Sequence, residues 1–239
     1  MFFDKVVYIE PDFYTDINGQ MSVAKSKIEL LKHLPYEHNL YLDVDGMALK
    51  DITQLMYDCI EMDKPYITDV LGEGKFMEDI SYDCWAKHEY AWPFFELDLG
   101  VTWRTVQSSW AYFRKGDFIK NHYTWLSHYL DKGYPLEMLK EKWAARQLPD
   151  ELLFSAVCAK FDYDPSFKYK PVFFGNYHIE GGLTAMENQF YIMSMWGNGN
   201  GTGNQAAPLT KVVYQEYYSG EMYKMARVQS KKLGTNLPY

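Results

Sequence analysis

The chain has 239 residues, a mass of 28.1 kDa, and 24 basic against 32 acidic side chains, which gives a formal net charge of −8. Its 47% hydrophobic and 23% charged residues are typical of one globular domain and exclude a disordered or fibrous chain. The acidic balance makes nucleic-acid binding an unlikely function, and no apolar run approaches the ~18 residues of a membrane span.

The first quarter of the chain predicts a strand–helix–strand unit. The β-branched and aromatic run at 6–9 predicts a buried strand, and apolar residues at helical spacing over 21–31 predict a helix with Lys27 on its polar face. A second strand is predicted at 39–42, followed by a helix at 51–62. A crossover of this length joins parallel strands, so an α/β fold with a parallel sheet is expected.

Further elements follow along the rest of the chain. The residue patterns predict strands at 66–70, 103–113 and 172–174, helices at 117–133, 135–146, from 149 onward and at 208–230, and a Gly-Asn loop at 197–204. We divide the chain into an α/β core over 1–182 and a C-terminal extension over 183–239, which carries the loop and the last helix and is expected to pack on the same domain.

The cysteines predict no covalent framework. Cys59, Cys84 and Cys158 are odd in number and sparse, and no pair has the spacing of zinc ligands. Together with the absence of a signal peptide at the N-terminus, this predicts reduced thiols in a cytoplasmic protein.

Asp43 and Asp45 are the strongest candidates for chemistry. They follow the predicted strand at 39–42, and ligands of open α/β sheets bind at the carboxyl ends of strands. Side chains two residues apart on a strand point to one side, so the two carboxylates are expected to converge. Such a pair suits a hard divalent cation, Mg²⁺ or Mn²⁺, and an alternative is that it caps the next turn.

The segment 41–52, Tyr-Leu-Asp-Val-Asp-Gly-Met-Ala-Leu-Lys-Asp-Ile, resembles the metal-binding D-x-D region of nucleotide-sugar glycosyltransferases of the GT-A fold, glycogenin-like enzymes among them. The helix around 24–31 is similar to the one that precedes the D-x-D. Residues 108–117 look like the strand that passes the donor sugar, and 148–156 like the later acidic motif D-Q-x-x-x-N. Tyr177-His178 follows a strand where these enzymes place a histidine ligand.

The resemblance implies a GT-A-like mixed, mostly parallel sheet flanked by helices, with a helical C-terminal tail. It implies that Asp45 binds Mn²⁺ or Mg²⁺, that Asp43 binds the metal or the donor ribose, and that His178 is the third ligand. A histidine without a ligand role, in the core or on the surface, is the alternative for His178.

The resemblance also implies the roles of the remaining site residues. Ser108 and Lys115 are expected to contact the nucleotide-diphosphate sugar donor, and Asp150 the sugar or the hydroxyl of an acceptor, as the catalytic carboxylate. A plain helix N-cap is the alternative for Asp150, and a solvated charge for Lys115. The motif departs from the family at Glu151, which replaces Gln, and at Ser155, which replaces Asn.

The expected function is therefore a metal-dependent glycosyltransferase. Only 42 residues precede Asp43, so the resemblance implies one strand and one helix where the family has two or more such units, and a short nucleotide-binding half. An alternative is a catalytically incomplete GT-A-like domain that binds a glycan or protein through its aromatic residues, which are 18% of the chain. A third interpretation is a metal-dependent phosphotransferase or hydrolase, for which Asp69, Glu73 and Asp79 are the other available acidic ligands.

Overall fold

The computed structural model describes residues 23–43, 46–75, 86–139, 149–174 and 188–194. The chain divides into two compact units, one of residues 1–41 with 59–168 and one of residues 42–58 with 169–239, and each is described by itself. From the sequence we divide the chain into residues 1–182 and 183–239, and that division stays a prediction.

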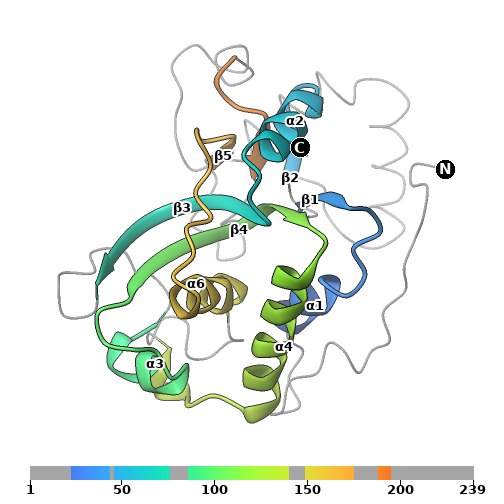
Figure 1. Ribbon diagram of the computed structural model, residues 1–239. Coiled ribbons are helices and arrows are strands. Elements are labelled where there is room, and N and C mark those ends of the chain that lie inside the picture. Colours follow the sequence, from blue (N-terminus) through green and yellow to red (C-terminus); the bar gives the residue numbers. More distant parts are fainter. Residues whose placement is uncertain (1–22, 44–45, 76–85, 140–148, 175–187, 195–239) are drawn as a thin grey trace, which may run out of the picture. The chain divides into compact units, whose positions relative to one another are not determined.

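The first unit alternates between helices and strands (Figure 1). Its elements are α1 (Val23–Leu30), β1 (His38–Leu42), β3 (Tyr66–Lys75), α3 (His88–Phe94), β4 (Thr102–Arg114), α4 (Asp117–Lys132), the 3₁₀ helix η2 (Leu136–Met138) and α6 (Asp150–Lys160). The mixed α/β class is thereby confirmed. None of the described helices, of which α4 with 16 residues is the longest, has the length and apolar character of a bilayer-spanning segment.

The sheet of the first unit has the strand order β1-β4-β3. β3 pairs antiparallel with β4, from Tyr66 opposite Phe113 to Lys75 opposite Thr102. The expectation of a mostly parallel sheet is therefore wrong for this longest described pairing. The physical reason is that β4 is buried along most of its length, so its residues do not indicate the direction of the neighbouring strand.

Two register irregularities bend the β3–β4 pair. One lies between Ile67 and Asp69, and there the hydroxyl of Thr68 lies within hydrogen-bonding distance of the carbonyl oxygens of Gln107 and Trp110, at 2.8 Å from the latter. Thr68 is fully buried. Its single O–H donor therefore lies beside two β4 carbonyl oxygens at the point where the regular ladder is interrupted, and donates to one of them at a time.

Replacing Thr68 by valine should lower the free energy of unfolding by about 1 to 3 kcal/mol, because valine keeps the shape and removes the hydroxyl donor from buried carbonyl groups. Urea denaturation checks this. Thr68→Ser keeps the hydroxyl and is the control for that loss. Equal stability of Thr68→Val and wild type would contradict the role given to the hydroxyl.

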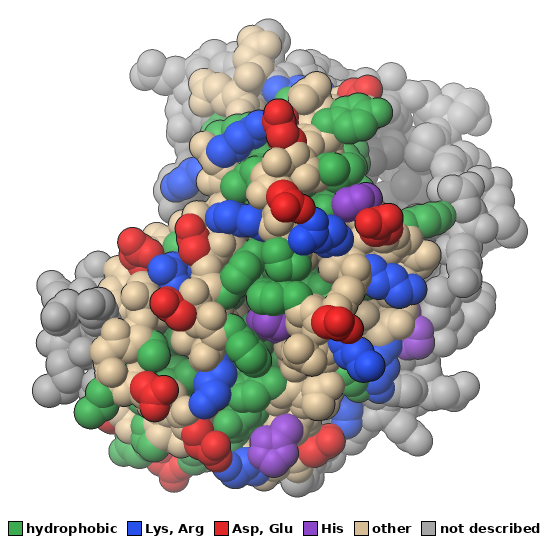
Figure 2. Space-filling model, viewed as in Figure 1, with side chains coloured by type: hydrophobic (Ala, Val, Ile, Leu, Met, Phe, Trp, Pro, Cys, Tyr) green, Lys and Arg blue, Asp and Glu red, His purple; other side chains and the backbone are tan. Residues whose placement is uncertain are grey.

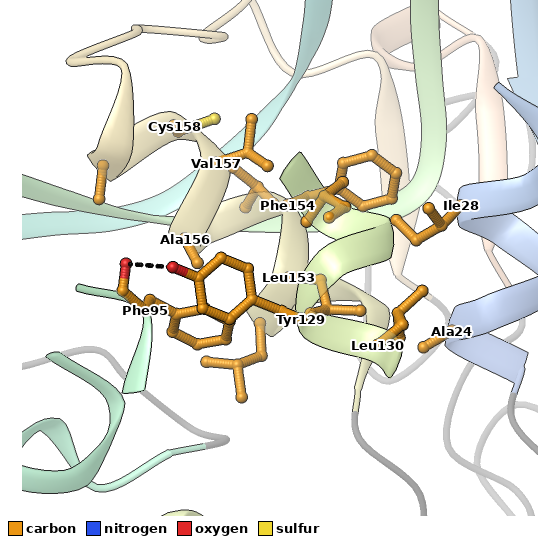
Figure 3. Packing of buried hydrophobic residues seen from close by; sticks show 14 of the residues in the cluster. Ala24, Ile28, Phe95, Tyr129, Leu130, Leu153, Phe154, Ala156, Val157 and Cys158 are labelled. Carbon is orange, nitrogen blue, oxygen red and sulfur yellow. Dashed lines mark hydrogen bonds between the residues drawn. The ribbon is translucent and has the colours of Figure 1, made fainter. Parts of the chain in front are cut away.

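The core of the first unit lies where α1, α4 and α6 meet (Figure 3). Ile28 of α1 points toward Leu130 of α4 and Phe154 of α6, and all three side chains are buried. The hydroxyl of Tyr129 on α4 donates to the carbonyl oxygen of Phe95, at 3.3 Å. Apolar packing of the Ile28 side chain therefore holds α1 against α6. This packing fixes the position of the polar residues that lie beside α1.

The second unit contains β2 (Gly46–Ala48), β5 (Val172–Phe174) and β6 (Ile192–Ser194) in the order β2-β6-β5. β2 and β6 pair antiparallel, whereas β5 and β6 pair parallel. α2 (Thr53–Glu61) begins in this unit and ends in the first. The predicted helix at 51–62 and strand at 172–174 are confirmed.

Some elements differ from the sequence-based expectation. The helix predicted over 135–146 is wrong at its start, where η2 is followed by a bridge between Ala86 and Leu139. α3, β2 and β6 are not predicted, because they have seven residues or fewer and show no clear period. The predicted elements at 6–9, 197–204 and 208–230 lie outside the described residues.

Candidate functional site

A buried polar cluster forms where α1, β4 and α6 meet. The Nζ atom of Lys27 lies 2.6 Å from Oδ2 of Asp150 and donates a hydrogen bond to Oγ of Ser108 at 3.1 Å. The Ser108 hydroxyl donates to the same Asp150 oxygen, at 2.5 Å. Three side chains that are far apart in the sequence therefore form one closed triangle of hydrogen bonds, which we call the Lys27 cluster.

Each member of the Lys27 cluster is placed by its own element. α1 packs its apolar face on α4 and α6 and presents Lys27 at the border of that face. Ser108 lies in the buried middle of β4. Asp150 is the first residue of α6, after Pro149 as N-cap, where a carboxylate is favoured by the helix dipole.

The carboxylate of Asp150 does not cap α6. Pro149 occupies the N-cap position, and no side-chain cap hydrogen bond is formed there. The capping alternative for Asp150 is thereby wrong, because its carboxylate is used by Lys27 and Ser108 instead. Two of the residues expected at the donor sugar, Ser108 and Asp150, are in direct contact.

Because the Lys27 cluster is buried, the electrostatic interactions among its side chains are strong. The side chains of Lys27 and Asp150 are 13% and 11% exposed, so water screens their attraction only weakly. A carboxylate that accepts from an ammonium group and a hydroxyl is stabilised by charge-assisted hydrogen bonds. Lys27 also lies 5.6 Å from the ring centre of Tyr41, at the end of β1, which adds a cation–π contact.

Glu151 extends the cluster along α6. Burial, followed by the charge of Asp150, raises the pKa of Glu151 to about 8, although Lys27 acts in the opposite direction. Glu151 is therefore protonated at neutral pH, while its neighbour Asp150 is paired with a cation.

The structure describes two further sequence-predicted site residues, Asp43 and Lys115. Asp43 directly follows β1 and is half-buried. Its carbonyl oxygen accepts from the N–H of Gly46 at 2.8 Å, and a Cβ atom at position 46 would lie 3.0 Å from that oxygen, so glycine permits this tight turn. Lys115 is exposed in the turn between β4 and α4.

The predicted metal site has only one of its three ligands, Asp43, among the described residues; Asp45 and His178 lie outside them. Within the described part of the chain, no group of three or more His, Cys, Asp or Glu side chains is placed to hold a metal ion. The Mn²⁺ or Mg²⁺ site thus remains a sequence-based prediction.

Two of the acidic residues of the phosphotransferase interpretation, Asp69 and Glu73, lie in β3. Asp69 is buried in β3 opposite Gln107, and Glu73 lies 3.3 Å from Nε of Arg104 in an ion pair. Asp79 lies outside the described residues. An engaged Glu73 is a poor candidate for a metal ligand.

Sequence reasoning missed Lys27 and Glu151. The helical pattern assigns Lys27 to the polar face of its helix, whereas its side chain is mostly buried. The available signal is its position directly before the buried Ile28, at the edge of the apolar stripe. For Glu151, the signal is its replacement of the family's glutamine beside Asp150.

In comparisons with protein-family models, with curated proteins and with solved structures, no match to this chain was found.

Proposed function

We propose that this chain is a metal-dependent glycosyltransferase that moves a sugar from a nucleotide-diphosphate donor to a hydroxyl acceptor. The observation that carries the proposal is the Lys27 cluster. The three segments that resemble the helix before the D-x-D, the donor-sugar strand and the later acidic motif contribute Lys27, Ser108 and Asp150, respectively. None of the three sequence patterns alone requires these three side chains to contact one another.

The chemistry of the cluster suits a polyhydroxylated ligand. An ammonium group, a hydroxyl and a carboxylate offer donors and acceptors at fixed positions, and charge-assisted hydrogen bonds to sugar hydroxyls are strong in a poorly hydrated site. Asp150 and Lys27 would bind and orient the transferred sugar or the acceptor hydroxyl. Positioning of this kind lowers the entropic part of the barrier to transfer.

The proposed metal ligands are Asp43, Asp45 and His178. When bound, Mn²⁺ or Mg²⁺ supplies Lewis-acid stabilisation of the charge that develops on the leaving nucleoside diphosphate. Lys115 would add a further positive charge for the phosphates, from its exposed turn.

A serine-hydrolase role is disfavoured for the same cluster. Ser108 would need a neutral base to take its proton. Lys27, its basic neighbour, is held as an ammonium ion by Asp150. Ser108 is thus better suited to hydrogen bonding than to nucleophilic attack.

The second candidate function is a glycan- or protein-binding domain without transferase activity. It is favoured by aromatic side chains at the surface of the described residues, such as Tyr36 at 65% and Phe161 at 44% exposed. Phe161, at the end of α6, contacts His122 and Trp125 of α4, and hydrophobic side chains are visible among the charged ones on the face shown in Figure 2. Flat rings of this kind stack on sugars.

A panel of nucleotide-diphosphate sugars with Mn²⁺ tests the proposal. At least one donor should raise the melting temperature and be hydrolysed or transferred. Asp45→Ala and Asp43→Ala should abolish the Mn²⁺-dependent part of this effect without unfolding the chain, because carboxylates that hold a ligand are not needed by the core.

The matched control is Asp131→Ala, which removes an exposed carboxylate of α4. It should behave as wild type. The proposal fails if no donor stabilises the wild-type chain in Mn²⁺, or if Asp45→Ala binds the donor as well as Asp131→Ala. Glycan binding without donor turnover would favour the second candidate.

A further inference from the structure

A polar cleft of about 320 Å³ lies between α1 and α4. This volume is within the range of sites for small ligands, about 300 to 1,000 Å³. The lining combines ammonium groups, carboxylates, hydroxyls and one apolar side chain, which belong to Lys25, Glu29, Lys32, Tyr123, Ser127, Leu130 and Asp131. The cleft therefore offers both donors and acceptors of hydrogen bonds to a ligand.

The cleft is distinct from the Lys27 cluster. Lys25 and Glu29 are four residues apart and share one face of α1, whereas Lys27 lies two residues from each of them and points to another side of the helix. Lys27 contacts Ser108 and Asp150, and neither of these lines the cleft. The two sites thus have no side chain in common.

Glu29 forms a buried polar wall of the cleft. Its side chain is 7% exposed, Oε2 lies 2.7 Å from Nζ of Lys32, and Oε1 accepts from the Tyr123 hydroxyl at 2.9 Å. Lys25 and the exposed Asp131 add one charge of each sign to the lining. Because the charges balance, an anion meets the carboxylates and a cation meets the ammonium groups. The cleft therefore has no net charge that would favour an ionic ligand.

Ser127 brings a hydroxyl to the cleft whose hydrogen-bonding capacity is unused. Its Oγ atom is buried and has no hydrogen-bond partner among the described residues. A buried hydroxyl without a partner is unfavourable, and a ligand that pairs with it recovers that free energy. A carboxylate accepts about four hydrogen bonds, and Glu29 has two partners in the described part of the chain. A ligand hydroxyl, which both donates and accepts, suits these two groups.

We propose that the cleft between α1 and α4 binds a neutral saccharide. Sugar hydroxyls donate to the Glu29 carboxylate and exchange hydrogen bonds with Ser127, and C–H groups of the sugar ring contact Leu130. A neutral ligand can do this without separating Glu29 from Lys32, whereas an ionic ligand competes with that pair. The inference goes beyond the proposed transferase and does not depend on it, because a free sugar needs neither nucleotide nor metal.

The first measurement is an NMR titration of the isotope-labelled full chain with glucose, galactose, mannose and N-acetylglucosamine, without nucleotide or Mn²⁺. At least one sugar should produce saturable shifts in the amide signals of the residues that line the cleft. The absence of saturable shifts with all four sugars overturns the proposal. Shifts confined to other parts of the chain, such as Ser108 and Asp150, also overturn it, because they place the sugar elsewhere.

The second measurement uses Ser127→Ala, which removes the hydroxyl without a described partner. Its affinity for the sugar should fall about three- to tenfold, because one neutral hydrogen bond is lost. Its melting temperature should equal that of wild type, because no described contact is lost. Asn121→Ala, on the exposed surface of α4, is the matched control and should change neither quantity. If Ser127→Ala binds the sugar as well as Asn121→Ala does, the assignment is wrong.

The third measurement tests the neutral character of the cleft. Glucuronate and glucosamine carry one negative and one positive charge, respectively, on the same ring as glucose. Both should bind more weakly than the neutral sugar that binds best, by about threefold or more, because each competes with the pair formed by Glu29 and Lys32. Tighter binding of either charged sugar contradicts a site for a neutral saccharide.

Discussion

Replacing Lys27 by methionine is expected to lower the free energy of unfolding by about 3 to 5 kcal/mol, which makes it one of the most damaging single changes in the Lys27 cluster. Methionine fills a similar volume, so the loss comes from the charge. Asp150, with a side chain 11% exposed, is then left as a buried carboxylate that still accepts from the Ser108 hydroxyl but has lost its cation. Chemical denaturation of the purified chain measures the change.

A double-mutant cycle with Asp150→Asn separates the ion pair from packing. The double variant should be more stable than Lys27→Met alone, because the uncompensated charge is gone. Lys120→Met is the matched control on the exposed surface of α4 and should change stability by less than about 0.5 kcal/mol. A Lys27→Met variant as stable as Lys120→Met would show that the cluster is solvated and would remove the main support for a built site.

The order of helices and strands can be predicted from the sequence where the apolar residues have a strong periodicity. The predicted helices at 51–62 and 117–133 and the strand at 103–113 are confirmed as α2, α4 and β4. α4 has apolar residues at helical spacing, an aspartate in its first turn, and Gly133 in the left-handed region with φ of 76° directly after its end. These signals are local, because each acts over one or two helical turns. They can therefore be recognised in the sequence alone.

The pairing of strands is not readable in the same way. β4 is buried along most of its length, so its side chains do not alternate between a core face and a solvent face. Its partner β3 contains Asp69, Gly72, Glu73 and Gly74, which weaken the strand pattern. Direction and register then depend on contacts between β3 and β4 and on the irregularities near Thr68, and none of these is a local property.

Two members of the candidate site are predicted from the sequence, but Lys27 and the hydrogen bonds among the three side chains are not. Ser108 and Asp150 are expected from sequence, yet their direct contact, and the contact of Lys27 with both of them, follow from how α1, β4 and α6 meet. A lysine at the border of an apolar stripe is usually solvated with its stem buried. Lys27 differs because Asp150 supplies a partner inside, and only the tertiary structure can provide this information.

His122 gives the second large prediction, which concerns pH. Its side chain lies on the buried face of α4, with its ring centre 3.7 Å from that of Phe118 and 4.5 Å from that of Phe161. Nδ1 lies within hydrogen-bonding distance of the Phe118 carbonyl oxygen, and the buried Nε2 has no hydrogen-bond partner among the residues that the structure describes. Burial among these rings lowers the pKa of His122 to about 4, from 6.5.

Folding therefore competes with protonation of His122. Between pH 6.5 and 4 the unfolded chain binds a proton that the folded chain does not, so the contribution of His122 is complete above pH 6.5 and is lost as the pH falls, by about 3 kcal/mol in all. Glu151 has the opposite sign. Because its folded pKa is raised to about 8, its contribution is complete below its unfolded value and is lost as the pH rises to 8.

The two contributions overlap between about pH 4.5 and 6.5 and should largely cancel there in the wild-type chain. Each single variant then reveals the other group. His122→Phe, which keeps a planar ring in the aromatic cluster, should lose stability relative to wild type as the pH rises through this window, whereas Glu151→Gln should gain. Urea denaturation of both variants, their double variant and wild type at half-unit pH steps measures the slopes. Parallel curves for His122→Phe and wild type would contradict a buried neutral histidine. The double variant, whose curve should be as flat as that of wild type, shows whether the two groups act independently, as expected because Glu151 lies at the start of α6 whereas His122 of α4 packs on Phe161, which follows the other end of α6.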